Sequence, residues 1–139
     1  MNVTELLNYI RQNVEMGIDG IKTVYDDTEN ADFKEELERQ LSEYNEIYNE
    51  ADNMLEHFGG EKKDVKAAAK IVSHLSGRMK SFSGSTSKIA ESMIQGSTMG
   101  VTKIIKHMNE YKGDGKVLQL AEKLLKTEEQ NIENLKKFL

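Results

Sequence analysis

The sequence predicts an all-α protein, an antiparallel four-helix bundle with a long crossover that carries an extra short helix. The chain of 139 residues contains no proline, the residue most disruptive to long helices. Apolar residues recur at alternating steps of three and four, as they do on the buried face of a helix. A weak internal repeat at an offset of 80 residues places residues 20–24 over 100–104, although chance similarity between amphipathic helices is an alternative explanation. We therefore expect one domain made of two helical hairpins, residues 1–60 and 86–139, joined by a crossover over 61–85.

The first helix is expected from about residue 3 to residue 26 or 27. Asn2 is placed to cap it, and Glu5, three residues later, completes the pattern of a capping box. The acidic run over 26–30 marks the following turn, because acidic residues are unfavourable at a helix C-terminus and favourable at the next N-terminus. The inward face is predicted to comprise Leu6, Ile10, Val14, Gly17, Ile21 and Val24.

The second helix is expected from about residue 32 to 58, and it keeps a strict heptad rhythm, which is typical of bundle packing. At 1.5 Å per residue it is ~40 Å long. Gly59 and Gly60 end it, since glycine readily adopts the left-handed conformation of a helix C-cap. Its inward positions are predicted to be Leu37, Leu41, Tyr44, Tyr48, Ala51, Leu55 and Phe58.

The crossover and the third helix follow. Apolar spacing predicts the extra short helix from about residue 63 to 81, and the serine- and glycine-rich run over 81–87 breaks it. The third helix is expected from about residue 86 to 111, and a Gly-Asp-Gly turn at 113–115 separates it from the last helix, residues 116–138. The inward positions of the third helix are predicted to be Ile89, Met93, Gly96, Gly100, Ile104, Met108 and Tyr111.

The last helix carries two polar residues on its apolar face. Its apolar positions are Val117, Ala121, Leu124, Leu135 and Phe138, and the same rhythm places Glu128 and Asn131 in the gap between them. A carboxyl group on a buried face is costly unless it is paired or protonated. One explanation is a residual metal or ligand site formed with Tyr44, Tyr48 and Asn131. The preferred explanation is a buried polar cluster of these residues that fixes the register of the helices, and rotation of the helix to expose Glu128 is a third.

Four glycines fall on predicted inward faces, Gly17 and Gly20 in the first helix and Gly96 and Gly100 in the third. A glycine inside a helix costs ~1 kcal/mol relative to alanine. Close approach of two helices is the commoner reason for such a glycine, and a small cavity for a ligand is the alternative.

Composition and charge exclude several classes of function. The chain has no cysteine, so it has no disulfide, thiolate metal site or thiol nucleophile. No apolar run approaches the ~20 residues that span a bilayer, and no secretory signal is visible, so we expect a cytoplasmic protein without membrane insertion.

The two halves of the chain carry opposite charge. Residues 1–60 have a net charge of −11 and residues 61–139 have a net charge of +6, for a total of −5. Opposite charges attract when the halves pack together or when two subunits meet, although two solvated helix faces are the simpler explanation. The acidic half argues against general nucleic-acid binding, which requires a coherent basic surface.

Several segments together resemble a known superfamily. They are EMGIDG at residues 15–20, the Gly59-Gly60 break with a short crossover helix after it, SKIAE at 87–91 continuing through Gly96 to Gly100, and EEQNIENL at 128–135. With two hairpins and a long crossover, the chain resembles the ferritin-like superfamily, and in particular small bacterial ferritin-like domains of unknown function. The match covers most of the chain and concerns the fold more than the activity.

The resemblance implies a di-iron or di-manganese centre only where the ligands are present. Such a centre takes one glutamate from each of two helices and a Glu-x-x-His pair from each of the other two. Glu128 matches the glutamate of one pair, but Asn131 stands in place of its histidine, and Tyr48 and Ala51 occupy the other pair's positions. Glu15 and Glu91 match the single glutamates.

These observations predict a non-catalytic structural or protein-interaction module, with a homodimer or another protein as its partner, no cofactor and no nucleic acid. The alternative is a ferritin-like protein that binds iron or manganese at a rearranged carboxylate site of Glu15, Glu91 and Glu128. A weaker alternative is a small-ligand binder with a cavity between the glycine-bearing helices.

Overall fold

The computed structural model describes residues 1–63 and 85–139. These two ranges form four helices, which are α1 (Val3–Tyr25), α2 (Ala31–Phe58), α4 (Thr86–Glu110) and α5 (Gly115–Lys136). Their bounds agree with the predicted ones to within two residues, the usual uncertainty of a helix end. The helix predicted over residues 63–81 lies outside the described residues.

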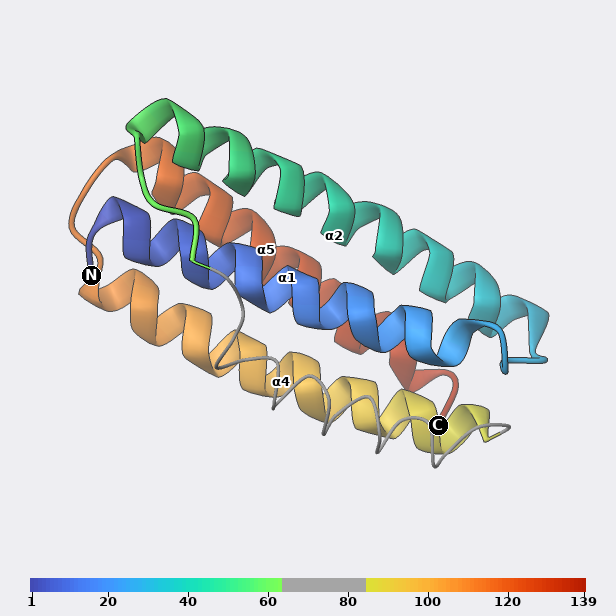
Figure 1. The fold of residues 1–139 in the computed structure, drawn as a ribbon. Helices are drawn as coiled ribbons and strands as arrows, with labels where there is room; N and C mark the ends of the chain where they lie inside the picture. Colours follow the sequence, from blue (N-terminus) through green and yellow to red (C-terminus); the bar gives the residue numbers. More distant parts are fainter. Residues whose placement is uncertain (64–84) are drawn as a thin grey trace.

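The four helices pack as two antiparallel pairs, α1 with α2 and α4 with α5 (Figure 1). In the bundle, α2 also packs on α5, and α1 packs on both α4 and α5. Helices α1 and α5 run in one direction, and α2 and α4 run in the other. The described chain therefore leaves α2 at one end of the bundle and enters α4 at the opposite end. This arrangement confirms the prediction of an all-α bundle.

Polar side chains begin each helix. Asn2 accepts a hydrogen bond from the backbone N–H of Glu5, whose side chain bonds back to the N–H of Asn2, so the predicted capping box is present. The side chains of Asn30, Ser85 and Asp114 each accept a backbone N–H in the first turn of α2, α4 and α5, respectively. These bonds satisfy backbone donors that have no partner within the helix.

The core follows the predicted stripes, and two predicted inward positions, Gly96 and Phe58, are exposed. The predicted positions in α1 are buried except for Gly17, which is half-buried. Gly96 was expected to face inward and is exposed. In the middle turns of α4 the buried positions are Ser97 and Gly100, so the adjacent residue 96 faces outward. Phe58, at the end of α2, is 39% exposed. An α-helix turns once in 3.6 residues, so a strict 3.5-residue rhythm drifts off the buried face along a straight helix.

No helix within residues 1–63 and 85–139 combines the length and apolar character that crossing a membrane requires.

Candidate functional site

The two polar residues on the apolar face of α5 are buried against α2. Glu128 is 4% exposed and Asn131 is fully buried. The Tyr44 hydroxyl donates a hydrogen bond to Glu128 Oε1 at 3.0 Å and accepts one from Asn131 Nδ2 at 3.1 Å. One phenol from the first hairpin therefore uses both its donor and its acceptor on side chains of the second hairpin.

Three more residues of α2 extend this contact. Arg39 donates to Asn131 Oδ1 at 3.0 Å and forms an ion pair with Glu36. Gln40 Nε2 donates to the same glutamate at 2.7 Å. The resulting set is called the polar cluster below. It consists of Glu36, Arg39, Gln40, Tyr44, Glu128 and Asn131. Glu36 and Gln40 are both buried. The carboxylate of Glu36 and the amide of Gln40 therefore form hydrogen bonds with these partners rather than with water.

Burial sets the protonation behaviour of the polar cluster. Removal from water raises the pKa of Glu128, while the nearby hydroxyls of Ser97 and Tyr44 favour the charged form and oppose part of the shift. Burial, and then the charge of Glu128, raise the pKa of Tyr44 well above its usual value. Tyr44 is thus a stable hydrogen-bond donor at neutral pH. Glu128 Oε2 is buried and makes no hydrogen bond of ordinary geometry with the described residues.

A glycine of α1 shapes the position of Tyr44. A methyl group added at Gly17 would lie 2.6 Å from Tyr44 Cε2, closer than carbon atoms approach in proteins. Helix α1 therefore packs directly on the tyrosine ring, and it can do so only because residue 17 has no side chain. The prediction that a glycine allows two helices to approach closely is therefore confirmed at Gly17. At Gly100 an added methyl group would lie 3.1 Å from Asn13 Nδ2.

The three predicted metal ligands differ in their exposure to solvent. Glu128 is buried, Glu15 is half-buried and Glu91 is exposed. Within residues 1–63 and 85–139, no group of three or more histidine, cysteine, aspartate or glutamate side chains is arranged to hold a metal ion. Glu128 accepts its hydrogen bond from the phenol of Tyr44.

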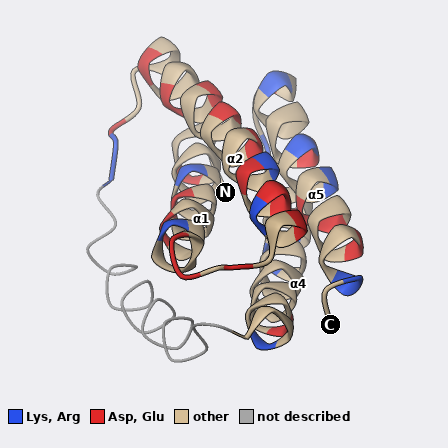
Figure 2. Cartoon of the chain, turned by 90° about the vertical axis from the view of Figure 1, so that its right-hand side faces the viewer, with Lys and Arg blue, Asp and Glu red and all other residues tan. Residues whose placement is uncertain are grey.

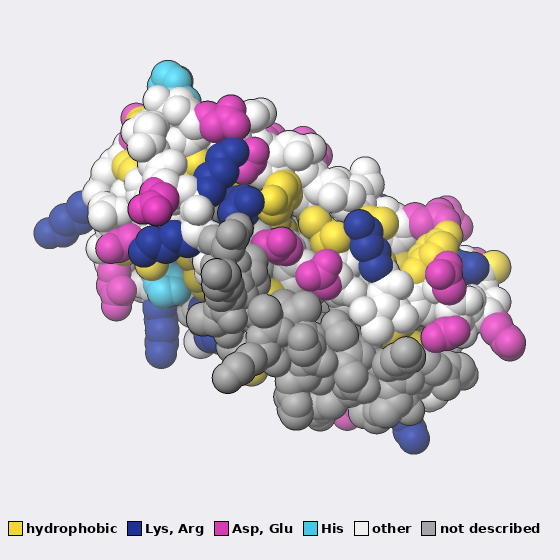
Figure 3. All heavy atoms as spheres, viewed as in Figure 1, with side chains coloured by type: hydrophobic (Ala, Val, Ile, Leu, Met, Phe, Trp, Pro, Cys, Tyr) yellow, Lys and Arg dark blue, Asp and Glu magenta, His cyan; other side chains and the backbone are white. Residues whose placement is uncertain are grey.

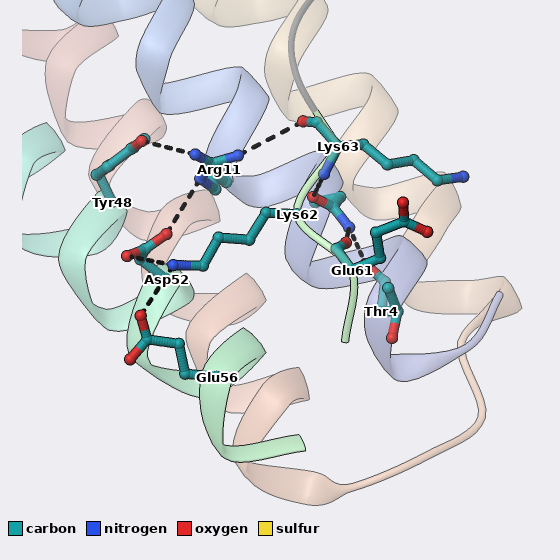
Figure 4. Close-up of polar contacts among 9 residues, drawn as sticks. Thr4, Arg11, Tyr48, Asp52, Glu56, Glu61, Lys62 and Lys63 are labelled. Carbon is teal, nitrogen blue, oxygen red and sulfur yellow. Dashed lines mark hydrogen bonds and ion pairs between the residues drawn. The ribbon is translucent and has the colours of Figure 1, made fainter. Parts of the chain in front are cut away.

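Tyr48 lies apart from the polar cluster, although the sequence grouped it with Tyr44 and Asn131. Its hydroxyl accepts a hydrogen bond from Arg11 of α1 at 2.9 Å, and the guanidinium lies 5.1 Å from the centre of its ring. Arg11 also pairs with Asp52, which in turn pairs with Lys62 (Figure 4). Tyr48 therefore belongs to a second network, between α1 and α2, near the end of the first hairpin.

Asn8 holds the segment that leaves this hairpin, residues 59–63. Its amide nitrogen donates to the carbonyl oxygens of Thr4 and Glu61, at 3.0 and 2.9 Å. Its amide oxygen accepts the backbone N–H of Lys63 at 3.0 Å. The side chain is 4% exposed, so its amide acts as a buried substitute for a peptide group and ties the segment to α1.

Asn8→Ala is expected to lower the free energy of unfolding by about 1–2 kcal/mol, because it leaves three part-buried backbone groups without their partner. Urea unfolding measures the loss, and Asn53→Ala, at an exposed position of α2, is the matched control. The Lys63 amide is also expected to exchange its hydrogen faster in the variant. Unchanged exchange at Lys63 would contradict the assigned role of Asn8.

Sequence analysis missed Glu36, Arg39 and Gln40. Their spacing contained a usable signal, because Arg39 follows Glu36 by three residues and Gln40 follows it by four, so all three share one side of α2. Nine acidic residues in this helix obscured that signal. No pattern in the sequence marks Asn8, because two of its three backbone partners lie more than fifty residues away.

Comparison with known proteins identifies the fold alone. No family model matches the sequence, and no curated protein matches it. The structure is similar to a crystal structure of a DUF305 fragment from Deinococcus radiodurans, with a TM-score of 0.81. The match covers 97% of this chain and 93% of that one, at 10% sequence identity. Similarity of this kind supports the four-helix architecture and carries no residue-level function.

Proposed function

We propose that this chain is a non-catalytic helical module of ferritin-like type that acts through contact with other protein surfaces and associates with itself. The observation that carries the proposal is how the polar cluster is used. Tyr44 and Arg39 of one hairpin bond to Glu128 and Asn131 of the other. The polar residues of the interior thus hold the two hairpins together. We therefore assign the binding of other proteins to the outer surface of the bundle.

The directions of the helices support the ferritin-like assignment. Helices α2 and α4 run parallel to each other, and each is antiparallel to the neighbours on which it packs (Figure 1). Bundles with one long crossover have this arrangement, whereas short loops throughout give an up-down-up-down order. The similarity to the DUF305 fragment supports the four-helix fold. The ferritin-like assignment rests on the directions of the helices.

The distribution of charge supports self-association. Helix α2 contains nine acidic and two basic residues, and the acidic residues, drawn red, occur along much of its length (Figure 2). Helix α4 contains two acidic and three basic residues. The acidic α2 therefore disfavours unrelated acidic partners, while α4 has nearly balanced charge and allows two copies of the chain to meet without repulsion.

Sedimentation velocity of the purified chain tests the proposal. Over roughly three orders of magnitude in concentration, we expect the weight-average mass to rise from that of a monomer to that of a dimer, as mass action requires. Added salt is expected to shift the equilibrium toward monomer, because exposed charges are screened. A monomer at every concentration would contradict self-association.

A further inference from the structure

We propose that the outward face of α4 is a self-complementary surface on which a second copy of this chain packs in antiparallel orientation. The inference rests on the self-association proposed above and names the surface that carries it. Residues 92–102, in the middle of α4, contain no charged side chain. Charged residues normally keep an outward helix face in water, so an exposed face without them for three turns is typical of a contact surface.

Exposed apolar side chains gather on the same helix. In the described part of the chain, two of the four large apolar side chains that are exposed lie on α4, with Met99 60% and Ile105 41% exposed. The other two, Phe58 and Leu139, lie at a helix end and at the chain end. Methionine is common on contact surfaces because its flexible side chain adapts to the partner.

Two threonines make this face less polar than its sequence suggests. Thr98 donates its hydroxyl to the carbonyl oxygen of Ile94 at 2.8 Å, and Thr102 donates to that of Thr98 at 3.1 Å. Both hydroxyl protons are used within the helix. A partner helix can therefore cover these side chains without removing a donor from water, which is the usual penalty for burying a hydroxyl group.

Charge fixes the partner as a second copy and fixes its direction. Glu91 is exposed on one side of the uncharged stretch, and Lys106 is exposed on the other. When Thr98 of one copy faces Met99 of an antiparallel second copy, Glu91 faces Lys106 of that copy. The two-fold axis repeats this pair. A parallel arrangement would instead place Glu91 opposite Glu91 and Lys106 opposite Lys106, and like charges across an interface are unfavourable.

The other helices offer no comparable surface within the described residues. The charged residues at exposed positions of α2 are all acidic, so two copies of that side would repel. Helix α5 has four acidic and four basic residues along its length. On the face shown in Figure 3, acidic and basic side chains lie between small groups of apolar ones. The outward face of α4 is therefore the surface that two copies can share.

Sedimentation of two matched variants tests the surface. Met99→Glu places a charge at the centre of the face, and we expect the dissociation constant of the dimer to rise about tenfold or more, since the residue occurs twice in the interface. Gln119→Glu adds the same charge at an exposed position of α5, and its dissociation constant is expected to stay within about twofold of the wild type.

Disulfide trapping tests the direction, because the chain has no cysteine of its own. Glu91→Cys and Lys106→Cys chains are prepared separately, mixed and oxidised. We expect mixed disulfide dimers to dominate, since a disulfide requires Cα atoms within about 7 Å. Either variant oxidised alone is expected to cross-link several-fold less. Cross-linking of Glu91→Cys with itself, in excess of the mixed product, would overturn the antiparallel arrangement.

The outcomes separate this inference from the proposed function. A dimer that Met99→Glu leaves intact would overturn the α4 surface while self-association stands. A wild-type chain that stays monomeric would overturn both. A monomeric wild type that loses thermal stability on Met99→Glu, while Gln119→Glu does not, would assign the face to a contact within the chain and would also overturn the proposal.

Discussion

Glu128→Gln is expected to increase the free energy of unfolding by about 1–2 kcal/mol at pH 8, because it removes a buried charge while keeping the shape of the side chain. The amide oxygen of glutamine can still accept the hydrogen bond from Tyr44. The wild-type carboxylate has a second oxygen that is buried without a hydrogen bond to the described residues. Few substitutions of a buried polar residue stabilise a protein, so the sign of this effect is informative.

The pH dependence gives the same prediction a second test. Burial raises the pKa of Glu128 in the folded state above its value in the unfolded chain, so the folded state binds this proton more tightly. Stability contributed by this group therefore falls as pH rises from the ordinary glutamate pKa to the raised one, and it stays low above that range. The advantage of Glu128→Gln is expected to be small in acid, to grow through this range and then to level off.

Urea unfolding of both proteins from about pH 4 to pH 8 covers the range in which the two states differ in protonation. Glu129→Gln, at the next position of α5 and exposed, is the control, and its stability difference from wild type is expected to show no such rise. If Glu128→Gln were less stable than wild type throughout, the carboxylate would contribute more through its hydrogen bond to Tyr44 than burial costs it.

Gly17→Ala and Gly96→Ala are expected to change stability in opposite directions, although both replace a glycine inside a helix. At residue 17 the new methyl group meets the Tyr44 ring at 2.6 Å. The ring cannot move away easily, because its hydroxyl is bonded to Glu128 and Asn131. We expect a net loss of about 1–2 kcal/mol, in which overpacking exceeds the gain in helix propensity.

At residue 96 the methyl group meets nothing within 4 Å, so only the helix propensity changes. A gain of about 1 kcal/mol is expected. Thermal unfolding at a concentration where the chain is monomeric compares the two variants. Gains of equal size would show that α1 moves away from Tyr44 without cost, and that Gly17 does not position the ring.

The sequence predicted the helices of the described ranges and part of the polar cluster. Different signals in the sequence made these two predictions possible. Helix ends depend on nearby residues, so Asn2 with Glu5 and the Gly59 break were sufficient to place them. Glu128 and Asn131 were found because they interrupt a regular apolar face. Tyr44 was found because it lies on the predicted inward face of the second helix, and its hydroxyl bonds to Glu128.

Other features depend on information that one-dimensional spacing lacks. Tyr48 follows Tyr44 by four residues, more than one full turn, and that extra rotation brings it to Arg11 of α1 instead of α5. Gly96 was placed inward by the same heptad approximation. Arg39 reaches the cluster from a half-exposed position because its long side chain extends along the helix to Asn131. The helix expected over residues 63–81 stays a prediction.

The polar cluster also affects which hairpin pairs with which during folding. The two hairpins have similar apolar stripes, so hydrophobic burial alone distinguishes poorly between the correct pairing and a hairpin paired with a copy of itself. In a pairing of two second hairpins, each Glu128 would lose the phenol that Tyr44 supplies. In a pairing of two first hairpins, Arg39 would lose Asn131. An uncompensated buried polar group costs several times what a satisfied one contributes, so the cluster selects one hairpin of each kind and disfavours exchange of like hairpins between chains.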